Sequence, residues 1–527
     1  MPLTGLDLPA PIDLEALLTL GLQTKPDEPA LTAETGCLTW QELAEATSRL
    51  ASAYLDRGLR PGDRIATLMP NRPAQVIHNL ACLRAGVVAT PMNYRYTHSE
   101  IDHALQVSGA SLLIHHQERT TDIAKSKFAN TLAHGKIEFS DDDDCAFAML
   151  MAKGDSKATF DPHLHDSPAF VLFTSGSTGS AKGVTHTRET LGWILASVSS
   201  AFQLSPADTV MPGSSFSHMA ATIFSLAGLA SGTRVVVPRG SHPEELLPLL
   251  RRARPTVMFA LPATLSLLVH DHGTVREDFA SVRVCLAGGD KLSEELEDEY
   301  TELVGRPIEE GYGMTEIGHA ITLPVGSPFR QGSVGKPCPG FEFSIRNDDG
   351  EEVPRGSEGR AWVRFPGITA GYWEQPEATN ETIVDGWLDT GDVMYADEEG
   401  YLWFHGRKKQ IIVHDASNIF PGDVEDALAK HPAIEAVGVV GVHDRVHGEN
   451  VRAYVTLRRG VSQPSASELI QFARDWIGYK APEEIVFLEK LPVNAAGKTD
   501  RLILKRMAEK QKNRGVKRES TNSHSGT

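Results

Sequence analysis

Short apolar runs alternate with amphipathic stretches along the first 400 residues of the chain. Runs typical of buried strands span residues 64–69, 87–92 and 169–173. Apolar residues at helical spacing predict helices over residues 73–85 and 188–202. Thr39, followed three residues later by Glu42, is typical of a capped helix start. This alternation predicts an α/β fold with a mainly parallel sheet.

Two later regions extend the prediction. The apolar runs 235–238 and 257–262 predict strands of a second buried sheet. Beyond residue 406, helices over 423–430 and 466–477 and strands over 437–442 and 451–457 predict a small α+β domain. A chain of 527 residues exceeds what one core normally supports. We therefore expect a large domain over residues 1–405, a small one over 406–507 and a disordered tail over 508–527.

The composition and charge of the chain favour an ordinary globular protein over nucleic-acid-binding and membrane-inserted classes. Hydrophobic residues make up 41% and charged residues 23%, as in ordinary globular proteins. A net charge of −18 disfavours nucleic acid as a partner. The first basic residue is Lys25 and no apolar run has the ~18–20 residues of a membrane helix, so we expect neither a signal peptide nor membrane insertion. The cysteines are scattered without a C-x-x-C pair, typical of a reduced cytoplasmic protein. The oligomeric state stays open, with a homodimer among the alternatives.

A polar, glycine-rich stretch follows the apolar run 169–173. Residues 174–183 contain five hydroxyl side chains, three glycines and Lys182. Glycines let backbone N–H groups approach a ligand, while hydroxyls and a lysine complete a cradle for phosphate oxygens. The spacing is not that of a Walker A loop, because Lys182 lies between Ala181 and Gly183. A polar linker is the alternative interpretation, and the preceding strand favours phosphate binding.

Three further motifs follow in a fixed order. They are Gly311-Tyr312-Gly313-Met314-Thr315-Glu316, Asp389-Thr390-Gly391-Asp392 and, near the end, Gly497-Lys498. Together with the loop they closely resemble the motifs of the adenylate-forming enzymes, the superfamily of acyl- and aryl-CoA synthetases, luciferase and peptide-synthetase adenylation domains. The resemblance covers most of the chain. It implies an α/β fold, with a large N-terminal adenylate-forming domain of packed β-sheets and flanking helices and a small mobile α+β C-terminal domain.

The resemblance assigns residues to MgATP. The loop residues are Thr174, Ser175, Gly176, Ser177, Thr178, Gly179 and Lys182. Tyr312 would offer an aromatic face to adenine, Thr315 a hydroxyl near the α-phosphate, and Glu316 a carboxylate to Mg²⁺. Asp392 would accept hydrogen bonds from the ribose hydroxyls, since a carboxylate has two acceptor oxygens and no donor. The other nucleotide-binding candidates are Gly289, Asp290, Gly311, Gly313 and Arg407.

The resemblance also implies a hinge and a moving lysine. Residues 401–410 lie where the family joins its domains, with Lys409 at the hinge position. Lys498 would neutralise the carboxylate and the α-phosphate during adenylation, although an isolated lysine is typical of a surface. The small domain would then rotate and form a tunnel in which CoA attacks the acyl carbon. The implied cofactors are ATP, Mg²⁺ and CoA, and the implied substrate is a small carboxylic acid.

An apolar set is expected to line the acyl site. By spacing alone His218 is typical of a packed histidine, whereas the family places an aromatic-plus-histidine motif beside the pantetheine tunnel. His218 is therefore a candidate gate and catalytic residue, with Thr315, Glu316 and Lys498. The pocket candidates are Phe216, His218, Met219, Phe259, Gly288, Gly313, Met314 and Gly318. The set has no obvious charged selector, so we expect a fatty or alicyclic acid rather than an amino acid.

Two positions depart from the family pattern. Gln410 stands where aspartate is common, and Asp415 replaces a glycine that lets pantetheine pass close to the backbone. A carboxylate there adds bulk and negative charge beside an anionic cosubstrate. Alternative hypotheses are therefore catalysis of one half-reaction, or transfer to a carrier-protein phosphopantetheine or an amine. A non-catalytic nucleotide-binding protein on the same fold is a further alternative. The joint presence of five charged motif residues disfavours it: Lys182, Glu316, Asp392, Arg407 and Lys498.

Overall fold

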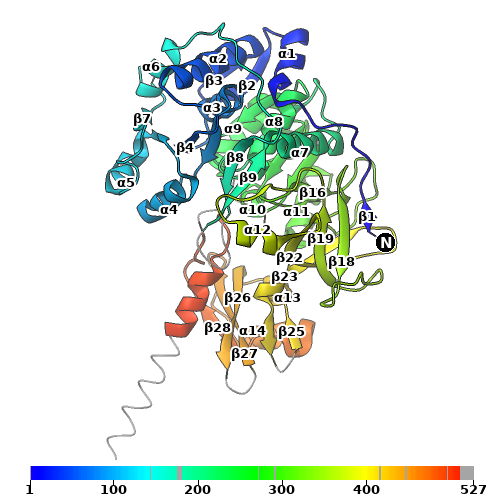
Figure 1. The fold of residues 1–527 in the computed structure, drawn as a ribbon. Helices are drawn as coiled ribbons and strands as arrows, with labels where there is room; N and C mark the ends of the chain where they lie inside the picture. The colour runs from blue at the N-terminus through cyan, green and yellow to red at the C-terminus, as the bar shows by residue number, and fades with distance from the viewer. Residues whose placement is uncertain are drawn as a thin grey trace, which may run out of the picture. The chain divides into compact units, whose positions relative to one another are not determined.

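The computed structural model describes residues 2–510, apart from 143, 175–180, 271, 290, 291, 293, 415, 416, 445–447, 495 and 496. The chain divides into two compact units (Figure 1). Unit 1 comprises Met1–Ser344, Trp362–Asp389 and Asp397–Trp403. Unit 2 comprises Ile345–Ala361, Thr390–Ala396 and Phe404–Thr527. The predicted α/β class, with a large sheet-rich unit and a small one, is confirmed.

The first sheet of unit 1 has seven strands in the order β20-β9-β8-β5-β4-β6-β7. Its parallel strands are β4 (Arg64–Leu68), β5 (Val88–Pro91), β6 (Leu112–His116), β7 (Lys136–Phe139) and β8 (Pro168–Phe173). β9 (Gly183–Thr187) runs antiparallel to β8, and β20 (Gly371–Tyr372) runs antiparallel to β9. The three strands predicted here are confirmed to within one residue at each end. The glycine-rich stretch thus connects two antiparallel strands rather than a strand and a helix.

The second sheet of unit 1 also has seven strands, in the order β14-β13-β12-β10-β11-β2-β3. They are β2 (Pro29–Ala33), β3 (Gly36–Thr39), β10 (Thr209–Gly213), β11 (Arg234–Val237), β12 (Val257–Ala260), β13 (Val284–Ala287) and β14 (Glu309–Glu310). All neighbours are parallel except β2 and β3. The runs 235–238 and 257–262 are β11 and β12, so the predicted second sheet is confirmed.

Helices connect these strands, and local signals fix their ends. Thr39 and Glu42 form the predicted capping box at the start of α2. The predicted helix 73–85 is α3, which begins with Pro73 and ends at Gly86 with a φ of 70°. The helices of unit 1 are α1 (Thr19–Thr24), α2 (Trp40–Asp56), α3 (Pro73–Ala85), α4 (His98–Ser108), α5 (Thr120–Lys125), α6 (Ala146–Lys153), α7 (Arg188–Ala201), α8 (Met219–Ala230), α9 (Pro243–Ala253), α10 (Pro262–His270), α11 (Glu294–Val304) and α12 (Pro376–Thr382).

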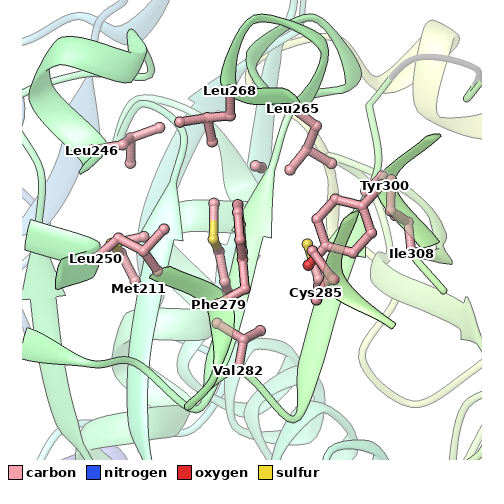
Figure 2. Packing of buried hydrophobic residues seen from close by; sticks show 14 of the residues in the cluster. Met211, Leu246, Leu250, Leu265, Leu268, Phe279, Val282, Cys285, Tyr300 and Ile308 are labelled. Carbon is pink, nitrogen blue, oxygen red and sulfur yellow. The ribbon is translucent and has the colours of Figure 1, made fainter. Parts of the chain in front are cut away.

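A buried apolar cluster joins the second sheet to α9, α10 and α11 (Figure 2). Met211 and Cys285 come from β10 and β13, and Leu250 and Tyr300 come from α9 and α11. The ring of Tyr300 packs edge-on against Phe279, with centroids 5.3 Å apart. Burying each large apolar side chain contributes about 1.5–3 kcal/mol. The cluster therefore holds in place the carboxyl ends of β12 and β13, where ligands bind in open α/β sheets.

Short strands complete unit 1 and continue across the boundary between the units. β15 (Tyr312–Met314), β16 (Gly318–Thr322) and β17 (Lys336–Pro337) form a three-stranded sheet. Residues 312–314 of the 311–316 motif therefore form a strand, and Thr315 and Glu316 lie in the turn between β15 and β16. A further sheet contains β1 (Leu3–Thr4), β18 (Glu342–Arg346), β19 (Gly359–Arg364), β21 (Ile383–Val384), β22 (Trp387–Ala396) and β23 (Leu402–Arg407).

The C-terminal part of unit 2 is an α+β body, as predicted. Its strands are β24 (Ile412–His414), β25 (Ser417–Ile419), β26 (Ile434–Asp444), β27 (Gly448–Leu457) and β28 (Glu484–Phe487). α13 (Pro421–Ala429) and α14 (Ala466–Ile477) share an apolar core with this sheet. Residues 501–510 are also helical, with Leu504 and Ala508 buried, so the tail expected from residue 508 overlaps this helix. Across the described residues, we find no helix with the length and apolar character of a membrane span.

Candidate active site

Two hydrogen bonds join the ends of the predicted phosphate loop, Thr174 and Lys182, which we call the neck of the loop. The N–H of Thr174 donates to the carbonyl of Lys182 at 3.1 Å, and the N–H of Lys182 donates to Oγ1 of Thr174 at 3.3 Å. These two bonds extend the β8–β9 pairing to the base of the loop. The other predicted loop residues, Ser175, Gly176, Ser177, Thr178 and Gly179, lie outside the described residues. The sequence thus anchors a loop by its two ends, with the lysine at one of them.

Lys182, Tyr372 and Glu316 lie in a row beside this neck. Nζ of Lys182 lies 4.2 Å from the centroid of the Tyr372 ring. The hydroxyl of Tyr372 donates to Oε1 of Glu316 at 2.9 Å. Glu316 is buried, with 5% of its surface exposed. The structure therefore brings two predicted residues, one cationic and one anionic, onto a tyrosine that the motifs do not contain.

The backbone of Thr315 and Glu316 is held from both sides. Nε2 of His186 donates to the carbonyl of Thr315 at 2.8 Å, and the N–H of Thr369 donates to the carbonyl of Glu316 at 2.7 Å. Burial lowers the pKa of His186 to about 4, so its imidazole is neutral near pH 7. These bonds fix the segment that carries both predicted catalytic side chains.

The glycines of the predicted site fit closely against protein atoms. A Cβ at Gly313 would lie 2.3 Å from the carbonyl oxygen of Gly318, and one at Gly311 would lie 2.5 Å from the imidazole of His319. A Cβ at Gly288 would lie 3.2 Å from the Phe259 ring. Packing within the protein is thus sufficient to require glycine at 311 and 313. Gly289 has a φ of 88°, and Asp290 lies outside the described residues.

Aromatic residues gather around the predicted acyl pocket. The Phe259 ring stacks on Phe224 at 5.9 Å between centroids, and Phe224 meets His319 edge-on at 5.7 Å. Burial lowers the pKa of His319 to about 4. Within the described residues its Nε2 has no hydrogen-bond partner. The pocket candidates Phe216, Met219 and Phe259 are buried, whereas Phe224 and His319 were not predicted.

His218 lies immediately before α8, the helix that carries Met219 and Phe224. It is the N-cap of the helix, and the amide nitrogen of Asn93 donates to its Nε2 at 3.2 Å. Phe216 is held through its N–H, which donates to Oδ1 of Asn71 at 2.8 Å. Both asparagines come from loops after strands of the first sheet. This arrangement fixes the orientation of His218, and its function as a gate stays a prediction.

In unit 2 the predicted ribose residues form an ion pair. Nε of Arg407 lies 3.0 Å from Oδ1 of Asp392. The Asp392 side chain is 1% exposed and that of Arg407 is 41% exposed. The N–H of Asp392 also donates to Oγ1 of Thr390 at 3.1 Å. The structure therefore joins two residues that the sequence placed in separate motifs.

The predicted hinge follows a dense charged cluster. His405 lies between Glu358, at 2.8 Å, and Asp423, at 3.1 Å, and stacks on the ring of Phe420. Burial alone would lower the pKa of His405, but the hydrogen bonds and charges of Asp423 and Glu358 outweigh it and raise the pKa. Lys409 lies in the 3₁₀ turn Lys408–Gln410.

The predicted adenylation lysine lies in a turn of unit 2. The N–H of Lys498 donates to Oδ1 of Asn494 at 3.1 Å, and the N–H of Asn494 donates to the carbonyl of Lys498 at 2.8 Å. Gly497, with a φ of 84°, makes this turn without strain. Asp415, the unusual tunnel residue, lies outside the described residues. Because Lys498 and Asp392 belong to unit 2, their approach to the phosphate loop stays a prediction.

A magnesium site built from substrate phosphates fits these residues. Glu316 is a buried carboxylate that is linked to Lys182 through Tyr372, and Mg²⁺ is normally held by one or two carboxylates plus phosphates. Within the described ranges, no group of three or more acidic, histidine or cysteine residues forms a metal cage. A single buried carboxylate at Glu316 is compatible with Mg²⁺ that is bound mainly by nucleotide phosphates.

Several residues that contact the predicted site were not predicted from the sequence. Tyr372, His186, His319 and Asn93 contact predicted residues but belong to none of the motifs. Tyr372 follows Gly371 outside the predicted motifs, and His186 lies within a buried strand, where a histidine is typically a core residue. The partners of His186 and Asn93, and the Lys182 partner of Tyr372, are more than a hundred positions away in sequence, so spacing alone carries no signal for them.

Comparison with known proteins identifies the family. The AMP-binding enzyme family matches residues 20–373, and the AMP-binding enzyme C-terminal domain matches residues 423–498. Feruloyl-CoA synthase of an Amycolatopsis species is 32% identical over 468 residues, covering 88% of this chain and 92% of the relative. The fatty acid–[acyl-carrier-protein] ligase ScoC of Streptomyces coeruleorubidus is 31% identical, covering 90% and 92%.

A solved structure extends the likeness to the fold. ATP-bound MatB from Rhodopseudomonas palustris matches with a TM-score of 0.87 and 25% identity, covering 94% of this chain and 99% of that chain. The sequence relatives and this structure span nearly the whole chain, including both units. The chain therefore belongs to the AMP-binding enzyme family, within the superfamily of adenylate-forming enzymes.

Proposed function

We propose that this chain is an AMP-forming acid–thiol ligase that activates a hydrophobic carboxylic acid with MgATP and transfers the acyl group to CoA. The observation that supports it most directly is the row of Lys182, Tyr372 and Glu316 at the neck of the phosphate loop. It offers a cation to phosphate oxygens and a buried carboxylate to the accompanying metal. A polar linker has no need of this arrangement.

The first half-reaction is adenylation. A carboxylate oxygen of the acid attacks the α-phosphorus of ATP, the bond to the β-phosphate oxygen breaks, and pyrophosphate leaves with its electron pair. Since anionic groups must approach each other, positioning and charge neutralisation supply most of the catalysis. Lys182 and the loop would steady the pyrophosphate, and Lys498 would face the carboxylate and α-phosphate. Glu316 would hold Mg²⁺, which supplies further charge neutralisation on the phosphates when bound.

The second half-reaction is thioester formation. The CoA thiol, as thiolate, attacks the acyl carbon and AMP leaves with the electrons of the acyl–oxygen bond. Thiols ionise partly near neutral pH, so no strong base is required. We propose that the segment after the 405/406 boundary rotates about Lys409 between the two steps and that His218 gates the thiol's path. The scattered cysteines support a cytoplasmic location.

The acid is proposed to be apolar. Phe216, Met219 and Phe259 are buried, and the candidate pocket set contains no carboxylate or ammonium. Feruloyl-CoA synthase and the fatty acid ligase, at 32% and 31% identity, are named for hydrophobic acids. Since the relatives differ in acid, the substrate is proposed only as a class.

Of the two alternative acceptors, a carrier-protein phosphopantetheine and an amine, the carrier protein is favoured by a specific observation. Asp415 puts a carboxylate where the family has a glycine beside pantetheine, and one relative is named as an acyl-carrier-protein ligase. A carrier-protein phosphopantetheine lacks the nucleotide phosphates of CoA. It would therefore meet less repulsion from this carboxylate.

The testing experiment is pyrophosphate–ATP exchange with a panel of fatty, alicyclic, aryl and amino acids. We expect exchange above background with hydrophobic acids and less with amino acids. AMP and acyl-thioester are then measured separately, with CoA and with a phosphopantetheinylated carrier protein as acceptors. Lys498→Ala is expected to lower adenylation by about 10²–10³-fold while thioester formation from supplied acyl-adenylate persists. Background exchange with every acid would contradict the function.

A further inference from the structure

Tyr372 contacts two residues of the phosphate site at once. Its ring lies 4.2 Å from Nζ of Lys182, and its hydroxyl donates a 2.9 Å hydrogen bond to Oε1 of Glu316. One side chain thus meets the ammonium proposed to bind phosphate and the carboxylate proposed to hold Mg²⁺. The proposed mechanism gives Tyr372 no part.

The backbone at Tyr372 is fixed to both neighbours. Tyr372 pairs with Val184, two residues after Lys182, and its N–H donates to Oγ1 of Thr379 at 2.9 Å. Thr369, three residues earlier, donates its N–H to the carbonyl of Glu316 at 2.7 Å. The ring therefore has a defined place relative to both Lys182 and the Glu316 segment.

The contact with Lys182 leaves its charge available. A π face attracts an ammonium through the ring quadrupole but carries no compensating net charge. Within the described part of the chain, no carboxylate lies within ion-pair distance of the Lys182 ammonium. A direct lysine–glutamate pair would instead have to break before a phosphate could bind.

The contact with Glu316 fixes the direction of its carboxylate. The hydroxyl of Tyr372 bonds to one of the two carboxylate oxygens, Oε1. A hydrogen bond from a neutral hydroxyl orients the carboxylate without bringing a compensating net charge to it.

We infer that Tyr372 is a positioning residue for MgATP: it separates Lys182 from Glu316 and directs both charges at the same ligand. The inference rests on the proposed function. It predicts that the hydroxyl and the ring of Tyr372 have separable effects, one on the metal-dependent part of ATP binding and one on the metal-independent part.

The test compares three variants of the full chain. Tyr372→Phe keeps the ring and removes the hydroxyl, and Tyr372→Leu removes both. Tyr401→Phe is the matched control, because Lys336 lies 4.4 Å from the Tyr401 ring and the Tyr401 hydroxyl donates to the Pro328 carbonyl at 3.0 Å. The control removes a similarly placed hydroxyl that contacts none of the proposed site residues.

Two measurements separate the effects. Calorimetry measures ATP binding without acid, in the presence and absence of Mg²⁺, and pyrophosphate–ATP exchange is followed against Mg²⁺ concentration. Tyr372→Phe is expected to reduce the Mg²⁺-dependent gain in ATP affinity about tenfold, because a hydrogen bond to a charged group is lost. Its affinity without Mg²⁺ should stay within about twofold of the unmodified chain, since the cation–π contact remains.

Tyr372→Leu and the control complete the series. Tyr372→Leu should also weaken ATP binding without Mg²⁺, by about threefold or more, because the ammonium loses its platform. Tyr401→Phe should change neither quantity. In a Glu316→Gln background, removing the Tyr372 hydroxyl should have no additional effect on the Mg²⁺ dependence, because both changes act through one carboxylate. Thermal unfolding of each variant shows whether the fold is intact.

Specific outcomes overturn the inference. If Tyr372→Phe binds MgATP as the unmodified chain does, or loses affinity equally with and without Mg²⁺, Tyr372 has only a structural role. In that case the unmodified chain still shows exchange and the proposed function stands. If the unmodified chain neither binds ATP nor catalyses exchange, the proposed function itself fails, and the inference fails with it.

Discussion

In unit 1 the ammonium of Lys182 lies on the face of Tyr372, whereas in unit 2 the guanidinium of Arg407 contacts the carboxylate of Asp392 directly. The first cation keeps its charge for a ligand, and the second is already compensated. Both residues lie in motifs that are proposed to bind the nucleotide. The difference indicates that Lys182 can offer its charge to a ligand, whereas a ligand at Asp392 must share an existing ion pair.

Histidines show the same contrast. In unit 1 burial lowers the pKa of His186 and of His319 to about 4, so both are neutral near pH 7. In unit 2 two carboxylates raise the pKa of His405 despite its partial burial. Burial therefore keeps these two histidines of unit 1 neutral, whereas unit 2 surrounds His405 with opposite charges.

The largest expected effect on the use of ATP comes from removing the ammonium of Lys182. Lys182→Met should lower kcat/KM for ATP in pyrophosphate exchange by about 10²–10³-fold, because the phosphates lose a preorganised charge. Lys336→Met is the matched control, since Lys336 also lies on a tyrosine face, 4.4 Å from the Tyr401 centroid. The kcat/KM of Lys336→Met for ATP should stay within about twofold of that of the unmodified chain. A loss below threefold for Lys182→Met would remove the proposed function of this ammonium.

A smaller effect is expected at the compensated cation. Arg407→Gln should lower kcat/KM for ATP by about tenfold or less, because the charge of Arg407 is already balanced by Asp392. Arg364→Gln, which breaks the exposed pair with Glu342, is a control for loss of an arginine. If Arg407→Gln were more damaging than Lys182→Met, the contrast between the units would be wrong.

Local signals predicted most of the fold. The helix predicted over 73–85 is bounded by Pro73 at its first residue and Gly86 after its last, and the start of α2 was predicted because Thr39 and Glu42 are three residues apart. These signals operate within a few residues. The apolar runs located β4, β5 and β8 and predicted that β11 and β12 belong to a second sheet, for the same reason.

The site residues that the sequence did not predict depend on contacts between segments that are far apart in the chain. β20 pairs with β9 across about 185 residues of sequence, and this pairing brings Tyr372 beside Lys182. No periodicity within either segment encodes such a register. His319 likewise contacts Phe202 and Phe224, which belong to other elements. The sequence could therefore name the charged residues but not the neutral groups that orient them.

The neutral histidines of unit 1 make its stability fall in acid. An unfolded histidine has a pKa of about 6.5, while the folded pKa of His319 is about 4, so this contribution is complete above pH 6.5 and is lost as the pH falls towards 4. His319→Leu should therefore reduce the loss of unfolding temperature between pH 7 and pH 5. The exposed His165→Gln serves as a control. An unchanged pH dependence in His319→Leu would contradict the buried neutral state.

The smallest effect, and one of opposite sign, is expected in unit 2. The groups that face His405 are Glu358 and Asp423, with Phe420 stacked on its ring and Lys480 paired with Asp423 at 3.0 Å. Since the folded pKa is raised, the contribution of His405 to stability is complete below about pH 6.5 and is lost as the pH rises through the folded pKa.

His405→Gln tests this sign. The variant keeps a hydrogen-bonding side chain but cannot carry a charge, so its deficit in stability relative to the unmodified chain should be largest near pH 6 and shrink towards pH 8.5. Amide hydrogen exchange of the α13 segment measures this deficit within unit 2. His431→Gln is the control, because His431 packs edge-on against Phe472. A deficit that stayed constant or grew with rising pH would mean that His405 is neutral between its two carboxylates, and that unit 2 treats its histidine as unit 1 does.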